Sequence, residues 1–216
     1  MKHRIIICLL AVLLTSPSAR AGDLVVVADF STWRGSKEVP SDWELKVKSG
    51  KADFMVGADE GLMALHLKSA NSSFSFERAV DIDLKRYPVL SWTWKVTKLP
   101  TGGDFRHSGT DDQAAQVFVA FSRTESIEYI WDTTAPQGLE ESTSPVFFMT
   151  VKVVVVRSGA AQAGKWLTET RNVYEDYKRL YGKEPPAVKG MRIQINTQHT
   201  GTAAESAFAQ MSFRTK

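Results

Sequence analysis

Side chains of alternating polarity recur along this chain, and this pattern constrains its fold more than any other feature. Between residues 89 and 96 every second position is apolar or aromatic after Val89, and serine, threonine and lysine lie between. Successive side chains of a strand point to opposite faces, so the pattern indicates a strand with one buried face. The same alternation predicts strands in four further segments, which are residues 62–68, 73–77, 191–196 and 207–213.

Denser apolar runs, rich in β-branched residues, are typical of central strands that are covered on both faces. Turn residues such as Ser49-Gly50, Gly102-Gly103 and Ser158-Gly159 separate the predicted strands at short intervals. About eight to ten short strands spaced in this way predict an all-β fold, namely an antiparallel β-sandwich or jelly roll. The dense runs are residues 24–30, 116–121, 127–131 and 147–156.

One segment has helical spacing. Tyr174, Tyr177 and Tyr181 recur at intervals of three and four residues, and Gly182 provides a stop at the C-terminal end. We therefore expect one short helix near residues 173–181.

The first 21 residues have the three parts of a secretory signal peptide. Residues 1–4 are basic, residues 5–14 form an apolar run, and Ala19-Arg20-Ala21 is a small-x-small cleavage site. The apolar run is too short to span a bilayer, and no second run of about 18 apolar residues follows. We therefore expect a periplasmic or secreted product, residues 22–216, that forms a single β-sandwich domain without stable membrane insertion.

The expected mature protein has no cysteine and a balanced charge. Cys8, the only cysteine, lies in the segment that is removed, so neither a disulfide nor thiol chemistry is expected. Three of the 27 basic residues also lie there, which leaves 24 basic against 24 acidic residues. This balance, without a long run of lysine and arginine, argues against nucleic acid or an anionic membrane as the main partner.

The densest polar cluster comprises Asp104, Arg106, Asp111, Asp112 and Gln113, just before a predicted strand. Three carboxylates with nearby carbonyls can bind Ca²⁺, which takes about six to eight oxygen ligands. They can also accept hydrogen bonds from sugar hydroxyls. Aspartates in a glycine-rich loop commonly bond to their own backbone instead, and an aspartate beside an arginine can form an ion pair. Ligand contact and turn closure both stand at this point, and no other cofactor is expected.

Tyr129 and Trp131 form a pair of aromatic side chains that leads into a long polar loop. Their flat rings can stack on a sugar, although aromatics on strand faces more often belong to the core, where each buries about 150–250 Å². Trp92 and Trp94 share a face with aliphatic residues, so we assign them to the core. Tyr129 and Trp131 are kept as candidate ligand contacts.

Arg171 lies just before the predicted helix and has two possible roles. Its planar guanidinium suits carboxylates, so it can line a polar ligand pocket, or it can clamp Asp176 and hold the helix to the sheet. The clamp is favoured because arginine side chains often lie along apolar surface. Arg171 is nevertheless retained as a candidate ligand contact.

Complete catalytic motifs are absent from the sequence, which has neither a Gly-x-Ser-x-Gly elbow nor a His-Glu-x-x-His helix. The three histidines beyond the signal peptide are widely separated, which does not favour a zinc site. A glycosidase needs two carboxylates at a fixed separation. Pairs such as Asp111 with Glu128, or Glu140 with Asp176, are available, but nothing in the sequence selects one of them.

Several motifs, taken in order, resemble a family of exported bacterial proteins described only as a domain of unknown function. The resemblance covers most of the mature chain and implies a bacterial periplasmic or secreted β-domain. The strand pattern is also similar to galactose-binding-like jelly rolls. The motifs are Trp92-Thr-Trp94, Asp111-Asp-Gln-Ala-Ala-Gln116, Tyr129-Ile-Trp131-Asp and Arg171-Asn-Val-Tyr-Glu-Asp-Tyr177.

One departure from that family concerns cation binding. Where the family typically has an Asp-Thr-Asp-Asn-Thr run, this chain has Asn196-Thr-Gln-His-Thr200. Two potential anionic ligands are thus replaced by neutral Asn196 and Gln198. If relatives bind a cation through this run, the resemblance implies that this chain binds it weakly or not at all.

These observations favour a non-catalytic binding module of the bacterial cell envelope, for a glycan or another polyhydroxylated ligand. Two alternatives remain. One is a carbohydrate-active hydrolase or lyase with Asp111 or Asp112 as the general base. The other is a structural partner of another envelope protein, and the sequence leaves the oligomeric state open.

Overall fold

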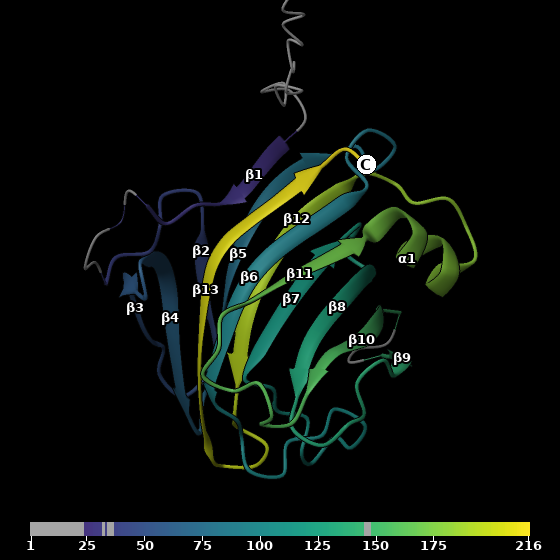
Figure 1. Cartoon of the computed structure of the whole chain (residues 1–216). Coiled ribbons are helices and arrows are strands. Elements are labelled where there is room, and N and C mark those ends of the chain that lie inside the picture. Colours follow the sequence, from purple (N-terminus) through teal and green to yellow (C-terminus); the bar gives the residue numbers. More distant parts are fainter. Residues whose placement is uncertain (1–23, 32, 34–36, 145–147) are drawn as a thin grey trace, which may run out of the picture.

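The computed structural model describes residues 24–216 except 32, 34–36 and 145–147. Its strands form two sheets stacked face to face (Figure 1). The expected sandwich is therefore confirmed, and the fold is a β-jelly roll. The expected signal peptide, residues 1–21, lies outside the described residues. Among the described residues no helix is long and apolar enough to cross a membrane.

The first sheet has six strands in the order β11-β6-β13-β4-β3, with β1 paired to β13. Every pair in it is antiparallel. Its strands are β1 (Leu24–Ala28), β3 (Asp53–Asp59), β4 (Leu62–Ala70), β6 (Val89–Lys98), β11 (Leu167–Asn172) and β13 (Ala203–Arg214).

The second sheet has seven strands in the order β2-β5-β12-β7-β8-β10-β9. One pair departs from the antiparallel expectation, because β8 and β10 run parallel. The short strand β9 lies antiparallel to β10 at the sheet edge. The strands are β2 (Glu44–Ser49), β5 (Ser73–Ile82), β7 (Ala115–Ala120), β8 (Glu125–Asp132), β9 (Glu140–Thr143), β10 (Thr150–Ser158) and β12 (Val188–Asn196).

Large aromatic side chains fill the space between the sheets. Trp92 and Trp94 of β6 are fully buried, as expected, and they meet Tyr129 and Trp131 of β8 from the other sheet. The ring centroids are 5.3 Å apart for Trp92 and Tyr129 and 5.9 Å apart for Trp94 and Trp131. Burial of such rings contributes a large share of the hydrophobic stabilisation.

The predicted helix is present as α1 (Val173–Tyr181). The side chain of Asn172 caps its N-terminus by accepting a hydrogen bond from the backbone N–H of Glu175. Gly182 ends the helix in the left-handed conformation at φ 69°, which glycine adopts without steric cost. On the inner side of α1, Tyr177 packs on Phe121 with ring centroids 4.5 Å apart.

The seven-stranded sheet has one face in the central core and one face outside it. Along β8, Ile127, Tyr129 and Trp131 belong to the core between the sheets. Ile130 lies on the opposite face, in a separate apolar cluster with Phe118. Phe105 belongs to the same cluster, so a loop covers one end of this outer face. The rest of the outer face is hollowed, and it carries the candidate site.

Candidate binding groove

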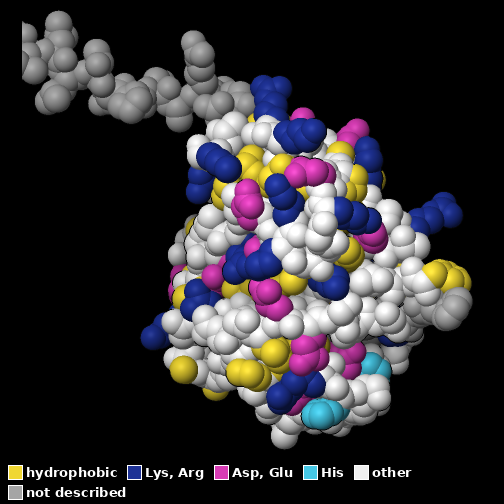
Figure 2. Space-filling view, turned by 90° about the vertical axis from the view of Figure 1, so that its right-hand side faces the viewer, with side chains coloured by type: hydrophobic (Ala, Val, Ile, Leu, Met, Phe, Trp, Pro, Cys, Tyr) yellow, Lys and Arg dark blue, Asp and Glu magenta, His cyan; other side chains and the backbone are white. Residues whose placement is uncertain are grey.

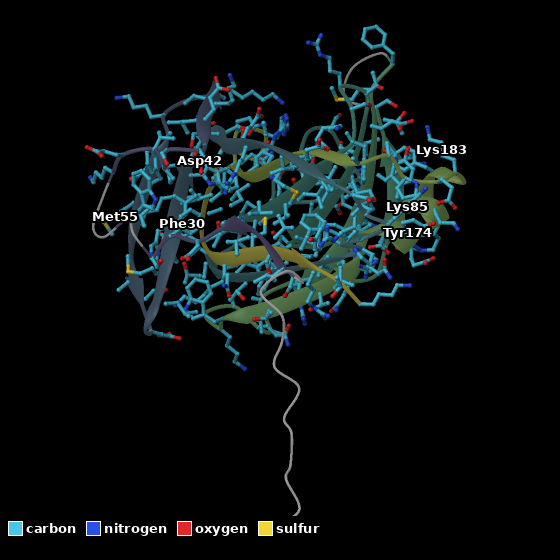
Figure 3. All side chains as sticks on the ribbon, turned by 90° about the horizontal axis from the view of Figure 1, so that it is seen from above. Phe30, Asp42, Met55, Lys85, Tyr174 and Lys183 are labelled. Atoms are coloured by element: carbon cyan, nitrogen blue, oxygen red, sulfur yellow. The ribbon has the colours of Figure 1, made fainter. Side chains whose placement is uncertain are left out.

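A groove with a volume of about 810 Å³ lies on the outer face of the seven-stranded sheet. The side chains that line it come from β2, β5, β12, β7, β8, β9 and β10 and the adjoining loops, so the groove runs across the strands. At the usual spacing between strands, the crossing from β5 to β9 covers roughly 24 Å. In Figure 3, Asp42 and Lys183 lie on opposite sides of the molecule. Asp42 lines the groove, and Lys183 pairs with Glu125, which lines it too.

Strand register places one row of side chains across the groove. Arg192 of β12 is opposite Glu77 on one side and Phe118 on the other. Phe118 of β7 is in turn opposite Glu128 of β8. Because these residues are directly paired, their side chains emerge on the same face of the sheet. The row therefore brings two glutamates and one arginine, which are distant in the sequence, onto one surface.

The neighbouring row explains why this face is hollow. Gly190 of β12 is opposite Ala79 and Ala120, and Ala120 is opposite Ser126. None of these side chains is larger than a hydroxymethyl group, so they leave open space above the sheet. A Cβ added to Gly190 would meet the nearest atom, the Cβ of Ala120, at 3.6 Å, which is ordinary contact.

Most of the carboxylates that line the groove have a cationic partner. Arg192 Nε lies 2.8 Å from Glu77 Oε1, and Arg78 lies 3.2 Å from Asp42. Lys183 Nζ lies 2.6 Å from Glu125 Oε1. Glu44 pairs with Lys46. The pairing with Lys183 lowers the pKa of Glu125.

Glu128 differs from those four. It is half-buried on the groove floor, and no hydrogen bond or ion pair to it is present within the described residues. Burial, together with the negative charge of Asp111 and against the opposing effect of Arg192, raises its pKa to about 8. A carboxyl group with this pKa is largely protonated at neutral pH, so Glu128 can donate a proton or a hydrogen bond into the groove.

Asp111 is the residue of the predicted polar cluster that lines the groove. Its Oδ1 accepts a hydrogen bond of 3.0 Å from Gln113 Nε2. Its backbone oxygen accepts one of 2.8 Å from Asn196 Nδ2. Burial raises the pKa of Asp111, whereas the bond from Gln113 and the nearby His199 lower it. Asp111 therefore has a fixed backbone and a carboxylate that faces the groove.

The other residues of that cluster have partners within the protein, and we call Asp104, Arg106, Asp112 and Gln113 the loop network. Arg106 bonds both oxygens of Asp104, at 2.8 and 2.6 Å, and holds the pKa of that carboxyl well below its usual range. Asp112 is fully buried and accepts the backbone N–H groups of residues 199 and 200. The structure thus gives these aspartates the turn-closing and ion-pair roles.

Two further expectations are corrected by burial. Tyr129 and Trp131 are both 0% exposed, so neither ring offers a face for stacking on a ligand. The Tyr129 hydroxyl donates a 2.8 Å hydrogen bond to Asp176 Oδ2, and Trp131 Nε1 donates to the carbonyl of Gly159. Both residues stabilise the interior, because the strand register turns them toward the opposite sheet.

Arg171 forms the clamp rather than a ligand contact. Its Nε and Nη2 lie 2.9 and 2.8 Å from the two oxygens of Asp176. Its guanidinium also lies 5.7 Å from the ring centre of Tyr129. These contacts tie β11 and β8, which belong to different sheets, to α1.

The carboxylates considered for Ca²⁺ do not converge. Within the part of the chain that the structure describes, no group of three His, Cys, Asp or Glu residues is placed to hold a metal ion. Asn196, at the departure from the family run, has a structural role. Its Oδ1 accepts the backbone N–H of Gln113 at 2.8 Å, and its Nδ2 holds the Asp111 carbonyl.

Sequence reasoning missed Glu77, Phe118 and Arg192 as groove residues. The available signal was their parity, because each occupies the same face as its neighbours two positions away on an alternating strand. Sequence reasoning did name Asp111 with Glu128 as one possible carboxylate pair. The structure favours this pair over the other named pair, Glu140 with Asp176, because both of those carboxylates bind Arg179.

Both charge signs occur over the side of the molecule that carries α1. Figure 2 shows basic and acidic side chains interspersed there, without a continuous basic stripe. This distribution agrees with the balanced charge of the sequence.

These features define a β-jelly roll with an open groove on one sheet. The chain belongs to the family described as "Protein of unknown function (DUF3047)", whose profile matches residues 32–212. The expected kinship with a family of unknown function is therefore confirmed. A search of curated proteins found no match.

Solved structures that are similar to this chain include proteins whose names refer to carbohydrates. The xyloglucanase domain of NopAA from Sinorhizobium fredii, in complex with cellobiose, has a TM-score of 0.51 at 9% identity and covers 88% of this chain and 100% of that domain. Endoglucanase cel12A from Rhodothermus marinus has a TM-score of 0.49 at 6% identity, with 89% and 99% covered. A family 11 carbohydrate-binding module from Clostridium thermocellum has a TM-score of 0.44 at 8% identity, with 85% and 94% covered. At these identities the likeness concerns the fold alone.

Proposed function

We propose that this chain is an exported module of the bacterial cell envelope that binds a glycan, or another polyhydroxylated ligand, in the groove. The observation that carries the proposal is the groove itself, which crosses several strands and has an extended, open shape. A linear polymer fits such a shape better than a small compact ligand does. Ligand sites are typically concave surfaces with a few fixed polar groups among apolar ones.

The chemistry of the groove suits hydroxyl groups. Its carboxylates accept hydrogen bonds, its three arginines donate them, and Glu128 in its protonated form does both. Aromatic stacking contributes little, because the Arg192 guanidinium covers the Phe118 ring at 4.7 Å from the ring centre. Recognition in this groove therefore depends mainly on hydrogen bonds, which distinguish sugars by the positions of their hydroxyls.

The fold is compatible with this proposal. The NopAA domain, whose TM-score exceeds 0.5, was solved with cellobiose. The proposal of export depends on the signal-peptide features of residues 1–21. Fractionation of the source bacterium with an antibody against the domain tests the location, and a purely cytoplasmic signal would contradict export.

A blocked groove tests the binding proposal. Ala120→Trp places an indole over the floor of small residues, and Thr168→Trp places one on the exposed edge strand β11 of the other sheet as a matched control. Glycan arrays followed by calorimetry with the best oligosaccharide measure the affinity. We expect Ala120→Trp to lose at least tenfold in affinity and Thr168→Trp to bind like the wild type. Equal affinity in the wild type and both variants would show that the ligand does not bind in the groove.

Of the two alternatives from the sequence, the structure bears on the hydrolase, because it narrows the choice of its general base. Asp112 cannot serve as its base, because its carboxylate is fully buried beneath backbone donors. Asp111 and Glu128 remain, and they carry the inference that follows.

A further inference from the structure

Six carboxylates line the groove, and only two of them lack a lysine or arginine partner within the described residues. Asp42, Glu44, Glu77 and Glu125 are paired as described above. Asp111 and Glu128 are the exceptions. Burial raises the pKa of both, and the charge of Asp111 also raises the pKa of Glu128. Paired carboxylates position side chains, whereas unpaired ones keep their lone pairs and protons for a ligand.

We propose that the groove hydrolyses the glycosidic bonds of its ligand, with Glu128 as the general acid and Asp111 as the general base. This inference rests on the proposed function, because it names a reaction at the same site. The inference requires two particular residues, whereas the proposed binding function requires only the groove.

The placement of the two residues supports different roles for them. Glu128 lies on the floor in the row of Arg192 and Phe118. Asp111 is attached at the level of Asn196, which is four positions along β12 from Arg192. At the rise of a strand this corresponds to about 13 Å between the two backbone levels. Side chains that reach into the groove from these levels leave space between their carboxyl groups.

This separation favours a single displacement with inversion. Inverting glycosidases hold their carboxyl groups about 6.5–9.5 Å apart so that a water molecule fits, whereas retaining enzymes hold them about 5–5.5 Å apart. On this wider spacing we assign Asp111 to activate a water molecule and not to attack the anomeric carbon itself. The bond from Gln113 Nε2 fixes one of its oxygens and leaves the other for that water.

The reaction conserves protons and involves no oxidation. Asp111 removes a proton from water as the water oxygen bonds to the anomeric carbon. The bond from that carbon to the glycosidic oxygen breaks, its electron pair stays on the oxygen, and Glu128 donates its proton there. The products are a sugar of inverted anomeric configuration and a free hydroxyl. Solvent then carries the proton from Asp111 back to Glu128.

The neighbouring groups fit these roles. Glu128 is away from cationic partners and retains its proton, which a general acid needs. Arg192 is already paired with Glu77, so its opposing effect on Glu128 is reduced. Burial raises the pKa of Asp111, which makes it a stronger base than an exposed aspartate.

Two conservative variants test the inference. Glu128→Gln and Asp111→Asn each keep the shape of the groove and remove one proton-transferring group. Asp81→Asn and Glu184→Gln are the matched controls, because both residues are exposed and lie outside the groove. Circular dichroism first establishes that all five proteins are folded.

The substrates are xyloglucan, mixed-linkage β-glucan, xylan, cello-oligosaccharides and peptidoglycan fragments. Release of reducing ends measures turnover, calorimetry measures affinity, and proton NMR of the first-formed anomer measures stereochemistry. We expect each site variant to lose about 10²–10⁴-fold in turnover with affinity kept within a few-fold. Turnover by the wild type is expected to fall as the pH rises through about 8, where Glu128 loses its proton.

Failure of the reaction and failure of binding give different results. Binding of a substrate without release of reducing ends overturns the hydrolysis and leaves the proposed binding function intact. Binding of none of the substrates overturns both. Undiminished turnover in Glu128→Gln or Asp111→Asn overturns the assignment of that residue, and retention of configuration overturns the role of Asp111 as a base.

Discussion

The loop network and the groove both contain several carboxylates, but they differ in what those carboxylates bind. In the loop network, Asp104 is bound by Arg106, and Asp112 is bound by two backbone N–H groups. In the groove, Glu128 is bound by neither a cation nor a donor of the described chain. Clustered acidic residues in a sequence therefore do not mark a site by themselves. Their partners, which only the fold determines, separate a structural cluster from one that is open to a ligand.

The same contrast occurs across a single strand. Tyr129 and Trp131 face the core from β8, whereas Glu128, next to Tyr129 in the sequence, faces the groove. A change on the inner face should therefore mainly affect stability, and a change on the outer face should mainly affect what the groove does with its ligand. Three predictions test this division.

Trp131→Ala should have the largest effect. Removal of a fully buried indole leaves a cavity and eliminates the hydrogen bond to Gly159, which costs about 3–5 kcal/mol of unfolding free energy. Urea denaturation followed by circular dichroism measures this loss. Ligand affinity of the fraction that remains folded should be unchanged. If the variant kept the stability of the wild type but no longer bound the ligand, Trp131 would belong to the binding site.

Asp112→Ala should come next, at roughly 2–4 kcal/mol. The substitution leaves the backbone N–H groups of His199 and Thr200 without their buried acceptor. The same denaturation measurement applies, with Asp81→Asn as the exposed control at less than about 0.5 kcal/mol. A loss of affinity without a loss of stability would show that the loop network, and not the groove, binds the ligand.

Elements with one apolar face could be predicted from the sequence, whereas a polar edge strand could not. Alternation predicted β4, β5, β6 and β12 because each has one apolar face, and spacing predicted α1. The strand β9 was missed because its residues are Glu-Glu-Ser-Thr, which show no apolar face at a sheet edge. Residues 24–30 were expected to be central, but β1 pairs only with β13.

The site was harder to predict than the fold, for a physical reason. Alternation shows that Tyr129 and Trp131 share one face and Glu128 the other, but it does not show which face meets the second sheet. The partners of each carboxylate are also contributed by remote strands, as with Arg192 of β12 and Glu77 of β5. Asp111 and Glu128 could therefore be named as a pair from the sequence but could not be chosen over other pairs.

Glu128→Gln should have the smallest effect on stability, and that effect should depend on pH. The pKa of Glu128 is about 8 in the folded protein against an ordinary value of 4.5. Between these values the folded state binds one more proton than the unfolded state, so the unfolding free energy of the wild type falls as the pH rises. A tenfold change in proton affinity corresponds to about 1.4 kcal/mol. Because Glu128 is only half-buried, we expect a loss on the order of 1–3 kcal/mol between pH 5 and pH 9.

The glutamine variant has no such proton to lose, so its stability relative to the wild type should rise across that range. Denaturation at pH 5, 7 and 9 measures the difference. Glu125→Gln is an informative comparison, because the pairing with Lys183 lowers the pKa of Glu125 and gives the opposite sign of dependence at lower pH. Parallel pH profiles for the wild type and Glu128→Gln would mean that the fold does not raise the pKa of Glu128. The carboxylates of the groove would then resemble those of the loop network, which are bound by the protein itself, and the distinction between the two regions would fail.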